Sequence, residues 1–319
     1  MRLVILPAIL VLGCAVAAAA PGESPLKISL SDTLLELQEG NSPVLQYKYR
    51  SVPFKPYAMS WFTPKGVNVL RDAPEDHKHH HSLMYAIMLG DINFWEEIPE
   101  AGRQLHRTFA NVSVDPKRAG FTETLVWQGP KRGKIMLFEQ RRLTHHLTDG
   151  GSARLLTWQS ELKCPKGEER VTLVGKIYHG LGMRFPVFMD KVGSFQFAQD
   201  ETGAFDDGPH HLAQASWCAY TVADGEHPVT VAMFSAKENP RPTLWFTMLE
   251  PFSYLAGTFD LSRNPITLEA GKTLTAKYGL AAWDGIVDNE TVQALYEQWQ
   301  KILENKDNKH PRKAKEHAS

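Results

Sequence analysis

The sequence lacks the signatures of several common enzyme classes. Its 319 residues include only three cysteines and no C-x-x-C pair. The G-x-S-x-G, H-E-x-x-H and G-x-x-x-x-G-K-[ST] patterns are also missing. These absences argue against a thioredoxin-like redox site, an α/β-hydrolase, a zincin and a nucleotide-binding P-loop.

Charge and long apolar runs are also scarce. The formal net charge is −1, so the chain has no strong field to attract nucleic acid. Beyond the first 20 residues, no apolar run reaches the roughly 18 to 20 residues that a membrane-spanning helix needs. We therefore expect no nucleic-acid partner and no membrane span, and no pattern predicts an oligomeric state.

The first twenty residues have the layout of a secretory signal peptide, in which Arg2 precedes an apolar run that ends in four alanines at 17–20. We expect residues 1–20 to be removed and the protein to reach the periplasm or the extracellular space. The alternative is a lipoprotein attached through Cys14, because Val-Leu-Gly-Cys resembles a lipobox. In an oxidising compartment Cys164 and Cys218 could then pair.

Short apolar runs with alternating polarity fill residues 21–287. In the first of them, Leu45, Tyr47 and Tyr49 share one face of an extended segment. Turn-forming residues separate the runs, and no βα alternation recurs. The pattern predicts an all-β domain over 21–287, a large antiparallel β-sandwich. Similar runs occur at 156–162, 171–174, 229–234 and 274–278.

The pattern changes to a helical period near the C-terminal end. Residues 288–304 are expected to form an amphipathic helix that docks on the sandwich, with Asp288 or Asn289 as its N-cap. Residues 305–319 are charged and polar, which is typical of a disordered tail. The apolar stripe of the helix consists of Val292, Leu295, Tyr296, Trp299, Ile302 and Leu303.

A histidine cluster is the strongest indication of chemistry. Four of the 13 histidines lie within Asp76-His77-Lys78-His79-His80-His81. An extended segment would bring His77, His79 and His81 to one face, whereas a helix would pair only His77 with His81. Either geometry can place imidazoles around a divalent metal ion or beside Asp76 as an oriented base. The alternative is a polar loop whose histidines bond to backbone and water.

Two further segments combine cations, amides and rings. Gly180-Leu181-Gly182-Met183-Arg184 has two glycines that would let the backbone bend, and Arg184 can then reach a carboxylate or a sugar hydroxyl. Asn239-Pro240-Arg241-Pro242-Thr243-Leu244-Trp245 precedes Glu250. Rings beside amides and charges suit a sugar, although a large aromatic such as Trp245 is normal in the core of a sandwich and the core is the favoured place for it. The residues expected to bind substrate are Asp76, His80, Trp95, Asn239, Arg241 and Trp245.

The order of these motifs resembles a bacterial family of unknown function often labelled "methane oxygenase PmoA". The resemblance covers about residues 25–287 and also includes Pro53-Phe54-Lys55-Pro56-Tyr57, Asn93-Phe94-Trp95 and Trp283-Asp284-Gly285. It implies an exported β-sandwich similar to the galactose-mutarotase-like supersandwich, from bacteria that degrade complex glycans. This sequence departs from the family at two places. Ser82 stands where the family usually has Gly after the histidines, and Phe234-Ser235-Ala236-Lys237 stands where an Asp-His-Pro element is expected.

Together these features predict a protein that acts on carbohydrate by acid–base catalysis, through epimerisation, β-elimination or hydrolysis. In this hypothesis His79 or His81 relays a proton, Arg184 holds an anionic oxygen, and Glu250 is the partner carboxylate. A noncatalytic glycan-binding or envelope protein is the first alternative. The second is metal-dependent oxidation, with His77, His79 and His81 holding copper or iron.

Overall fold

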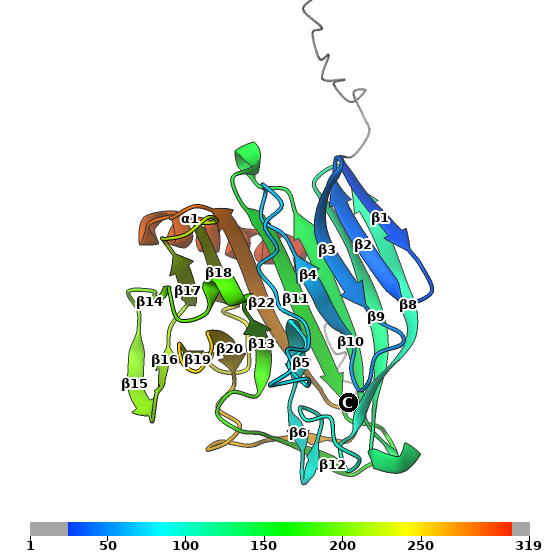
Figure 1. The fold of residues 1–319 in the computed structure, drawn as a ribbon. Coiled ribbons are helices and arrows are strands. Elements are labelled where there is room, and N and C mark those ends of the chain that lie inside the picture. The colour runs from blue at the N-terminus through cyan, green and yellow to red at the C-terminus, as the bar shows by residue number, and fades with distance from the viewer. Residues whose placement is uncertain (1–24, 308–319) are drawn as a thin grey trace, which may run out of the picture.

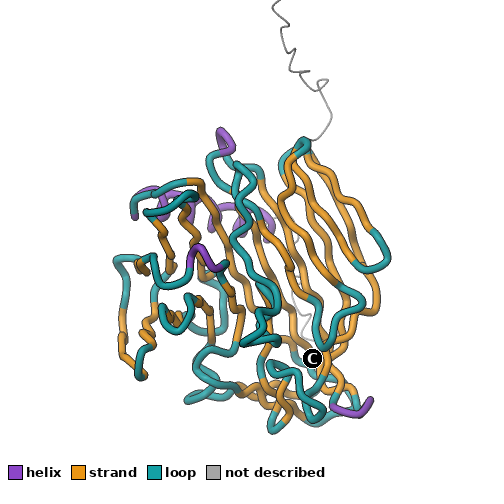
Figure 2. The backbone as a smooth tube through the Cα atoms, viewed as in Figure 1, coloured by secondary structure: helices purple, strands orange, loops and turns teal. Residues whose placement is uncertain are grey.

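The computed structural model describes residues 25–307. The expected signal peptide at 1–20 and most of the expected tail at 305–319 lie outside the described residues, whereas residues 305–307 continue the C-terminal helix. The described chain forms 22 strands in three antiparallel sheets, three short 3-10 turns and one α-helix. None of its helices is long and apolar enough to cross a membrane. Figure 2 shows how strand dominates the backbone.

Sheet I has ten strands. From one edge of the sheet to the other, they are β1 (Leu26–Leu30), β2 (Leu34–Glu39), β3 (Ser42–Lys48), β4 (Tyr57–Trp61), β5 (Leu83–Ala86), β13 (Gly180–Arg184), β20 (Tyr254–Thr258), β19 (Leu244–Met248), β16 (His210–Gln214) and β15 (Thr202–Asp207).

Sheet II has eight strands. In their order across the sheet, they are β14 (Ser194–Phe197), β17 (Trp217–Val222), β18 (Val229–Ser235), β22 (Thr273–Asp284), β11 (Arg154–Lys163), β10 (Ile135–His146), β9 (Arg118–Gln128) and β8 (Arg103–Asp115).

The remaining strands form sheet III, and three short 3-10 turns lie in the connections between strands. Sheet III has four strands, β21 (Ile266–Glu269), β12 (Arg170–Val174), β6 (Met88–Leu89) and β7 (Ile92–Asn93). The 3-10 turns are η1 (Pro130–Arg132), η2 (Asp149–Gly151) and η3 (Val187–Met189).

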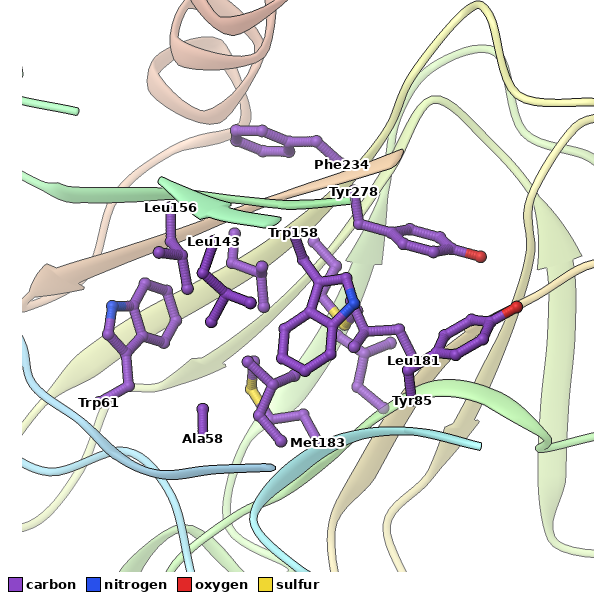
Figure 3. Close-up of a cluster of buried hydrophobic side chains, with 14 of the residues drawn as sticks. Ala58, Trp61, Tyr85, Leu143, Leu156, Trp158, Leu181, Met183, Phe234 and Tyr278 are labelled. Carbon is purple, nitrogen blue, oxygen red and sulfur yellow. The ribbon is translucent and has the colours of Figure 1, made fainter. Parts of the chain in front are cut away.

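The main core lies between sheets I and II. Figure 1 shows β1 to β4 lying over the strands of sheet II. Figure 3 shows Trp61 and Met183 of sheet I directed toward Leu143 and Trp158 of sheet II, and all four side chains are buried. The expected β-sandwich is confirmed. Burial of such large apolar side chains is the dominant stabilising contribution.

The outer face of sheet I, which points away from sheet II, carries a second apolar cluster. Alternation along β20 shows how this arises, because Leu255 belongs to the main core while Tyr254 and Ala256 belong to the outer cluster. On neighbouring β19, Phe246 is on the outer face and Trp245 is in the main core. Sheet I therefore has buried apolar side chains on both faces, and those on its outer face include several aromatic rings.

Helix α1 (Asn289–Asp307) packs against sheet II. The side chain of Asp288 accepts a hydrogen bond from the Thr291 N–H (2.8 Å), so Asp288 is the N-cap. Trp299 is fully buried beside Phe234 of β18, with ring centroids 5.9 Å apart. The helix thus presents its apolar stripe to the sheet, as its sequence period indicated.

Both described cysteines are buried as free thiols. The disulfide considered for Cys164 and Cys218 does not form. Cys218 lies in β17 of sheet II, whereas Cys164 directly follows β11. Packing, without a covalent cross-link between these thiols, therefore holds the described fold together.

We predict that Trp299→Ala destabilises the protein by about 3 kcal/mol or more, because it leaves a cavity between α1 and sheet II. It also removes the 2.9 Å hydrogen bond from the indole N–H to the Thr157 hydroxyl. Lys301→Ala on the exposed face of the same helix is the control, with an expected change within about 0.5 kcal/mol. Equal midpoints of the two variants in urea denaturation would contradict the assigned packing.

Candidate functional site

The histidine segment connects β4 to β5 at the outer face of sheet I. It is neither extended nor helical. Two successive turns form instead, closed by hydrogen bonds from the His77 N–H to the Pro74 carbonyl and from the His80 N–H to the His77 carbonyl, both 2.9 Å. The rings of His77, His79 and His80 lie close together, with centroids 4.5 to 5.8 Å apart. His81 instead bonds to Asp72 and Glu97, so it joins neither of the two groupings expected from the sequence.

His81 is held between two carboxylates. Its Nδ1 lies 2.8 Å from Asp72 and its Nε2 lies 2.9 Å from Glu97, while its ring stacks on Tyr57 at 4.3 Å. Burial disfavours the charged ring, but the two carboxylates outweigh that effect and raise the pKa of His81. With both ring nitrogens occupied, His81 is suited to positioning the carboxylates and has no free nitrogen for a ligand.

A buried lysine completes this group of charges. The Lys55 ammonium is 3.1 Å from Glu97 and its side chain is fully buried. Burial lowers the pKa of Lys55, although Glu97 opposes the shift. The pKa of Glu97 is itself lowered, because His81 and Lys55 together outweigh its burial. Glu97 thus accepts bonds from two cationic groups and is the central carboxylate of the network.

His80 lies in an apolar setting. Its ring is surrounded by Tyr254, Phe252 and Trp95, at centroid distances of 5.4, 5.6 and 6.1 Å. Burial, followed by the charges of neighbouring histidines and Arg184, lowers the pKa of His80 to about 2. The imidazole is consequently neutral at physiological pH, and its buried Nδ1 has no hydrogen-bond partner.

His179 is a second neutral histidine that sequence reasoning missed. It stacks on Trp95 with centroids 4.8 Å apart and planes 11° from parallel. Both of its ring nitrogens are buried without a partner, and burial lowers its pKa to about 3. A single histidine ahead of a glycine-rich strand has no sequence signal of its own, so only the tertiary contact reveals it.

Gly182 of β13 makes room for the aromatic rings above the strand. A Cβ at this position would lie 1.8 Å from the Tyr254 hydroxyl and 3.0 Å from Trp95. Any side chain there would displace both rings. The glycine therefore serves close approach, and not the backbone bend expected from the sequence. The Tyr254 hydroxyl is buried without a partner.

Arg184 lies beside this cluster. Its guanidinium sits 3.6 Å from the Phe252 ring centroid, and Nη1 donates to Asp190 and to the Ser253 carbonyl at 3.3 Å each. Arg184 therefore pairs with a nearby aspartate, one of the two roles considered for it. Its buried Nε has no partner.

The remaining predicted residues of the histidine segment lie close to the cluster. Nδ1 of His77 lies 2.9 Å from Asp76. Nδ1 of His79 lies 3.5 Å from Glu96, a carboxylate that the sequence analysis did not select. The histidines, which were expected to work with Glu250, thus lie beside four other carboxylates, Asp72, Asp76, Glu96 and Glu97.

Other predicted site residues lie elsewhere. Glu250 is exposed, and its described ion pair is with Lys191 at 4.0 Å. Trp245 is in the main core, where its indole N–H donates to the Ala215 carbonyl at 2.9 Å. Asn239 and Arg241 line a separate hollow. The structure thus gathers the histidines, Trp95 and Arg184, but does not bring these four residues to them.

The three-histidine metal site is not assembled. Across residues 25–307, no group of three or more His, Cys, Asp or Glu side chains has the arrangement of a metal centre. Both His81 nitrogens already face carboxylates. The described residues therefore do not fit a divalent ion held by His77, His79 and His81.

Unpartnered polar atoms are concentrated on the outer face of sheet I. Ten buried side-chain nitrogen or oxygen atoms in the described residues lack a hydrogen-bond partner. Six of them belong to only five residues on or beside this face. Each such atom costs about 1–3 kcal/mol, and native proteins have few. The five residues are His80, His179, Arg184, His210 and Tyr254.

The comparisons with known proteins show a family and a fold. A family model described as a family of unknown function (DUF6807) matches residues 34–297. No curated protein sequence matches the chain. The GH36 α-galactosidase AgaB from Geobacillus stearothermophilus is similar in structure, with a TM-score of 0.52 and 10% identity. That match covers 81% of this chain but only 41% of AgaB, so the likeness is one of fold.

Two mutarotase-related structures match along nearly their whole length at lower similarity. The galactose mutarotase related enzyme from Lactobacillus acidophilus has a TM-score of 0.40 and 8% identity, with 83% of this chain and 98% of that chain covered. A putative mutarotase from Salmonella typhimurium has a TM-score of 0.39 and 9% identity, with 84% and 96% covered.

We predict that His179→Phe makes stability less sensitive to acid. The pKa of His179 is lower in the folded protein than in the unfolded chain. As the pH falls below 6.5, the unfolded chain takes up a proton at this residue and the folded protein does not, so the free energy of unfolding decreases. At pH 5 this loss amounts to about 2 kcal/mol. Phe preserves the stacking on Trp95 and cannot titrate. Between pH 7 and pH 5 the free energy of unfolding should therefore fall by about 2 kcal/mol less in the variant than in the wild type.

Urea denaturation across this pH range is the measurement. His227→Phe, which changes an exposed histidine, is the matched control and should keep the wild-type slope. An identical pH dependence of wild type and His179→Phe would show that His179 is not held neutral in the fold.

Proposed function

The chain belongs to this family of unknown function, and we propose that it acts on a carbohydrate by acid–base chemistry at the outer face of sheet I. The proposed site is the ring cluster, which we define as His80, Trp95, Tyr178, His179, Phe246, Phe252 and Tyr254 together with the adjoining Arg184 and His210. Ring-to-ring contacts join the ring residues into one network, from His210 on Phe246 (4.8 Å) through to His80 on Phe252 (5.6 Å).

The concentration of unpartnered polar atoms among aromatic rings carries this proposal. A sugar presents C–H faces that lie on rings and hydroxyls that both donate and accept hydrogen bonds. The cluster offers the matching groups, namely the Tyr254 hydroxyl, the Arg184 Nε and the nitrogens of His179. Leaving such groups unpartnered costs stability, and a polar ligand that bonds to them would offset that cost.

Neutral imidazoles supply hydrogen-bond acceptors. His80 and His179, with pKa values of about 2 and about 3, stay neutral at physiological pH and can accept hydrogen bonds from sugar hydroxyls, but they are too weakly basic to act as the proton acceptor. His79 is more accessible and lies beside Glu96, so this pair takes the role that the sequence analysis gave to His79 with Glu250. In the proposal Arg184 donates to an oxygen on which negative charge develops.

Two other functions compete with this one. A noncatalytic glycan-binding protein would use the same rings and differ only in lacking turnover. Metal-dependent oxidation, which the label of the resembling family suggests, has no supporting observation among the described histidines. The fold likeness to AgaB agrees with a carbohydrate ligand but identifies neither a substrate nor a reaction.

We predict that His80→Phe and His179→Phe reduce turnover of a responsive sugar by about tenfold, as expected for the loss of a hydrogen bond to the ligand. Phe keeps an aromatic ring at each position and removes the nitrogens, but it is somewhat larger than His, so a modest fall in melting temperature is expected from overpacking. Turnover on a panel of monosaccharides and disaccharides is followed by NMR, and binding by calorimetry.

Lys78→Ala, an exposed residue of the same segment, is the control and should behave as wild type. Sugar binding that is lost in both Phe variants, with no turnover by the wild-type protein, would establish the binding function instead. If all three variants bind and turn over sugars as the wild type does, the ring cluster is scaffold and the proposal fails.

A further inference from the structure

A second, polar hollow lies away from the ring cluster. It has a volume of about 520 Å³, within the range of small-molecule sites. Gln214 and Thr243, at or beside one end of β16 and β19, help to line it. His210 and Met248 lie at the other ends of these strands. Five residues of strand span roughly 13 Å, so the hollow is separate from the ring cluster.

The wall of the hollow is rigidly built. Asn239 is clamped to Lys277, accepting the backbone N–H at 2.8 Å and donating to the carbonyl at 2.9 Å. The hydroxyls of Ser235 and Thr243 bond to each other at 2.7 Å. Tyr296 of α1 also lines the hollow, and it is nearly fully buried. Strand ends, a clamped loop and a helix therefore pre-form the cavity.

Positive charge predominates in this hollow. Arg241 is oriented through a single nitrogen, because Nη1 donates to the carbonyls of Phe259 (3.1 Å) and Asn264 (2.8 Å). Its other guanidinium N–H groups have no hydrogen-bond partner among the described residues. Lys237 is exposed, and it forms no ion pair within residues 25–307.

The one carboxylate of the lining is already engaged. Asp200 accepts the Ser216 N–H at 2.9 Å and also the Ser216 hydroxyl. Both of its oxygens are therefore satisfied in part by neutral donors, and neither forms an ion pair with Lys237 or Arg241. The lining as a whole thus combines two cations with hydroxyls, amides and one phenol ring.

We infer that this hollow binds an acidic saccharide, a sugar that carries a carboxylate or a sulfate. Arg241 and Lys237 would pair with the anionic group. Hydroxyl and amide groups of Ser235, Gln214 and Thr243 match the donors and acceptors of a sugar ring. The inference does not depend on the proposed function, because none of these groups belongs to the ring cluster.

Calorimetry with the full chain tests the inference. The probes are di-galacturonate and galactose-6-sulfate, with neutral galactobiose and inorganic sulfate as comparisons. At least one of the two acidic sugars should bind more tightly than galactobiose and more tightly than free sulfate. Lys237→Glu should weaken that binding by about tenfold or more, as expected for a lost charged hydrogen bond. Lys301→Glu makes the same charge change at an exposed site on α1 and should have no effect.

Several outcomes would overturn the inference. They are the absence of binding by both acidic sugars, equal affinity for galactobiose or for free sulfate, and an unchanged affinity in Lys237→Glu. His179→Phe should leave acidic-sugar binding intact, since it alters only the ring cluster. Loss of binding in that variant would mean that the two sites are one. The binding measurement with His179→Phe therefore tests the hollow separately from the proposed function of the ring cluster.

Discussion

The buried Arg141 of sheet II ties the sandwich together. Its guanidinium is fully buried, pairs with Glu139 at 2.9 Å and donates to the Tyr47 hydroxyl, the Gln104 side chain and the Pro56 carbonyl at 2.8 to 3.0 Å. A buried charge is tolerated only when it is paired and its donors are satisfied. Because the partners come from both sheets, this network requires one relative placement of the two layers.

The same network reaches the candidate site through the backbone. Lys55 and Tyr57 flank Pro56 in sequence. Lys55 then pairs with Glu97, and Tyr57 stacks on His81. Core packing therefore determines where these two side chains stand beneath the histidine segment. Such support from rigid elements is what a preorganised site requires.

The outer face of sheet I combines apolar packing with polar groups that lack partners. Elsewhere in the fold, buried polar side chains such as Glu139 and Ser160 bond to each other (2.7 Å). Four unpartnered atoms lie elsewhere in the described residues, but the other six are grouped on or beside the outer face of sheet I, which therefore carries most of the unsatisfied buried polar atoms of the described fold. The polar hollow near Arg241 differs in chemistry, with charges and hydroxyls in place of stacked rings.

The sequence by itself determined the strands and the C-terminal helix, and it singled out the histidine segment without determining the two turns that the segment forms. Alternation predicted strands, and the stripe through Trp299 predicted the helix, because both periods depend on neighbours along the chain. Tertiary structure alone decided that Glu97 meets His81, that His179 stacks on Trp95, and that Arg241 lines a separate hollow. These contacts depend on how the sheets pack and on the register of their strands. Residues far apart in the sequence determine both together, so no local sequence pattern predicts them.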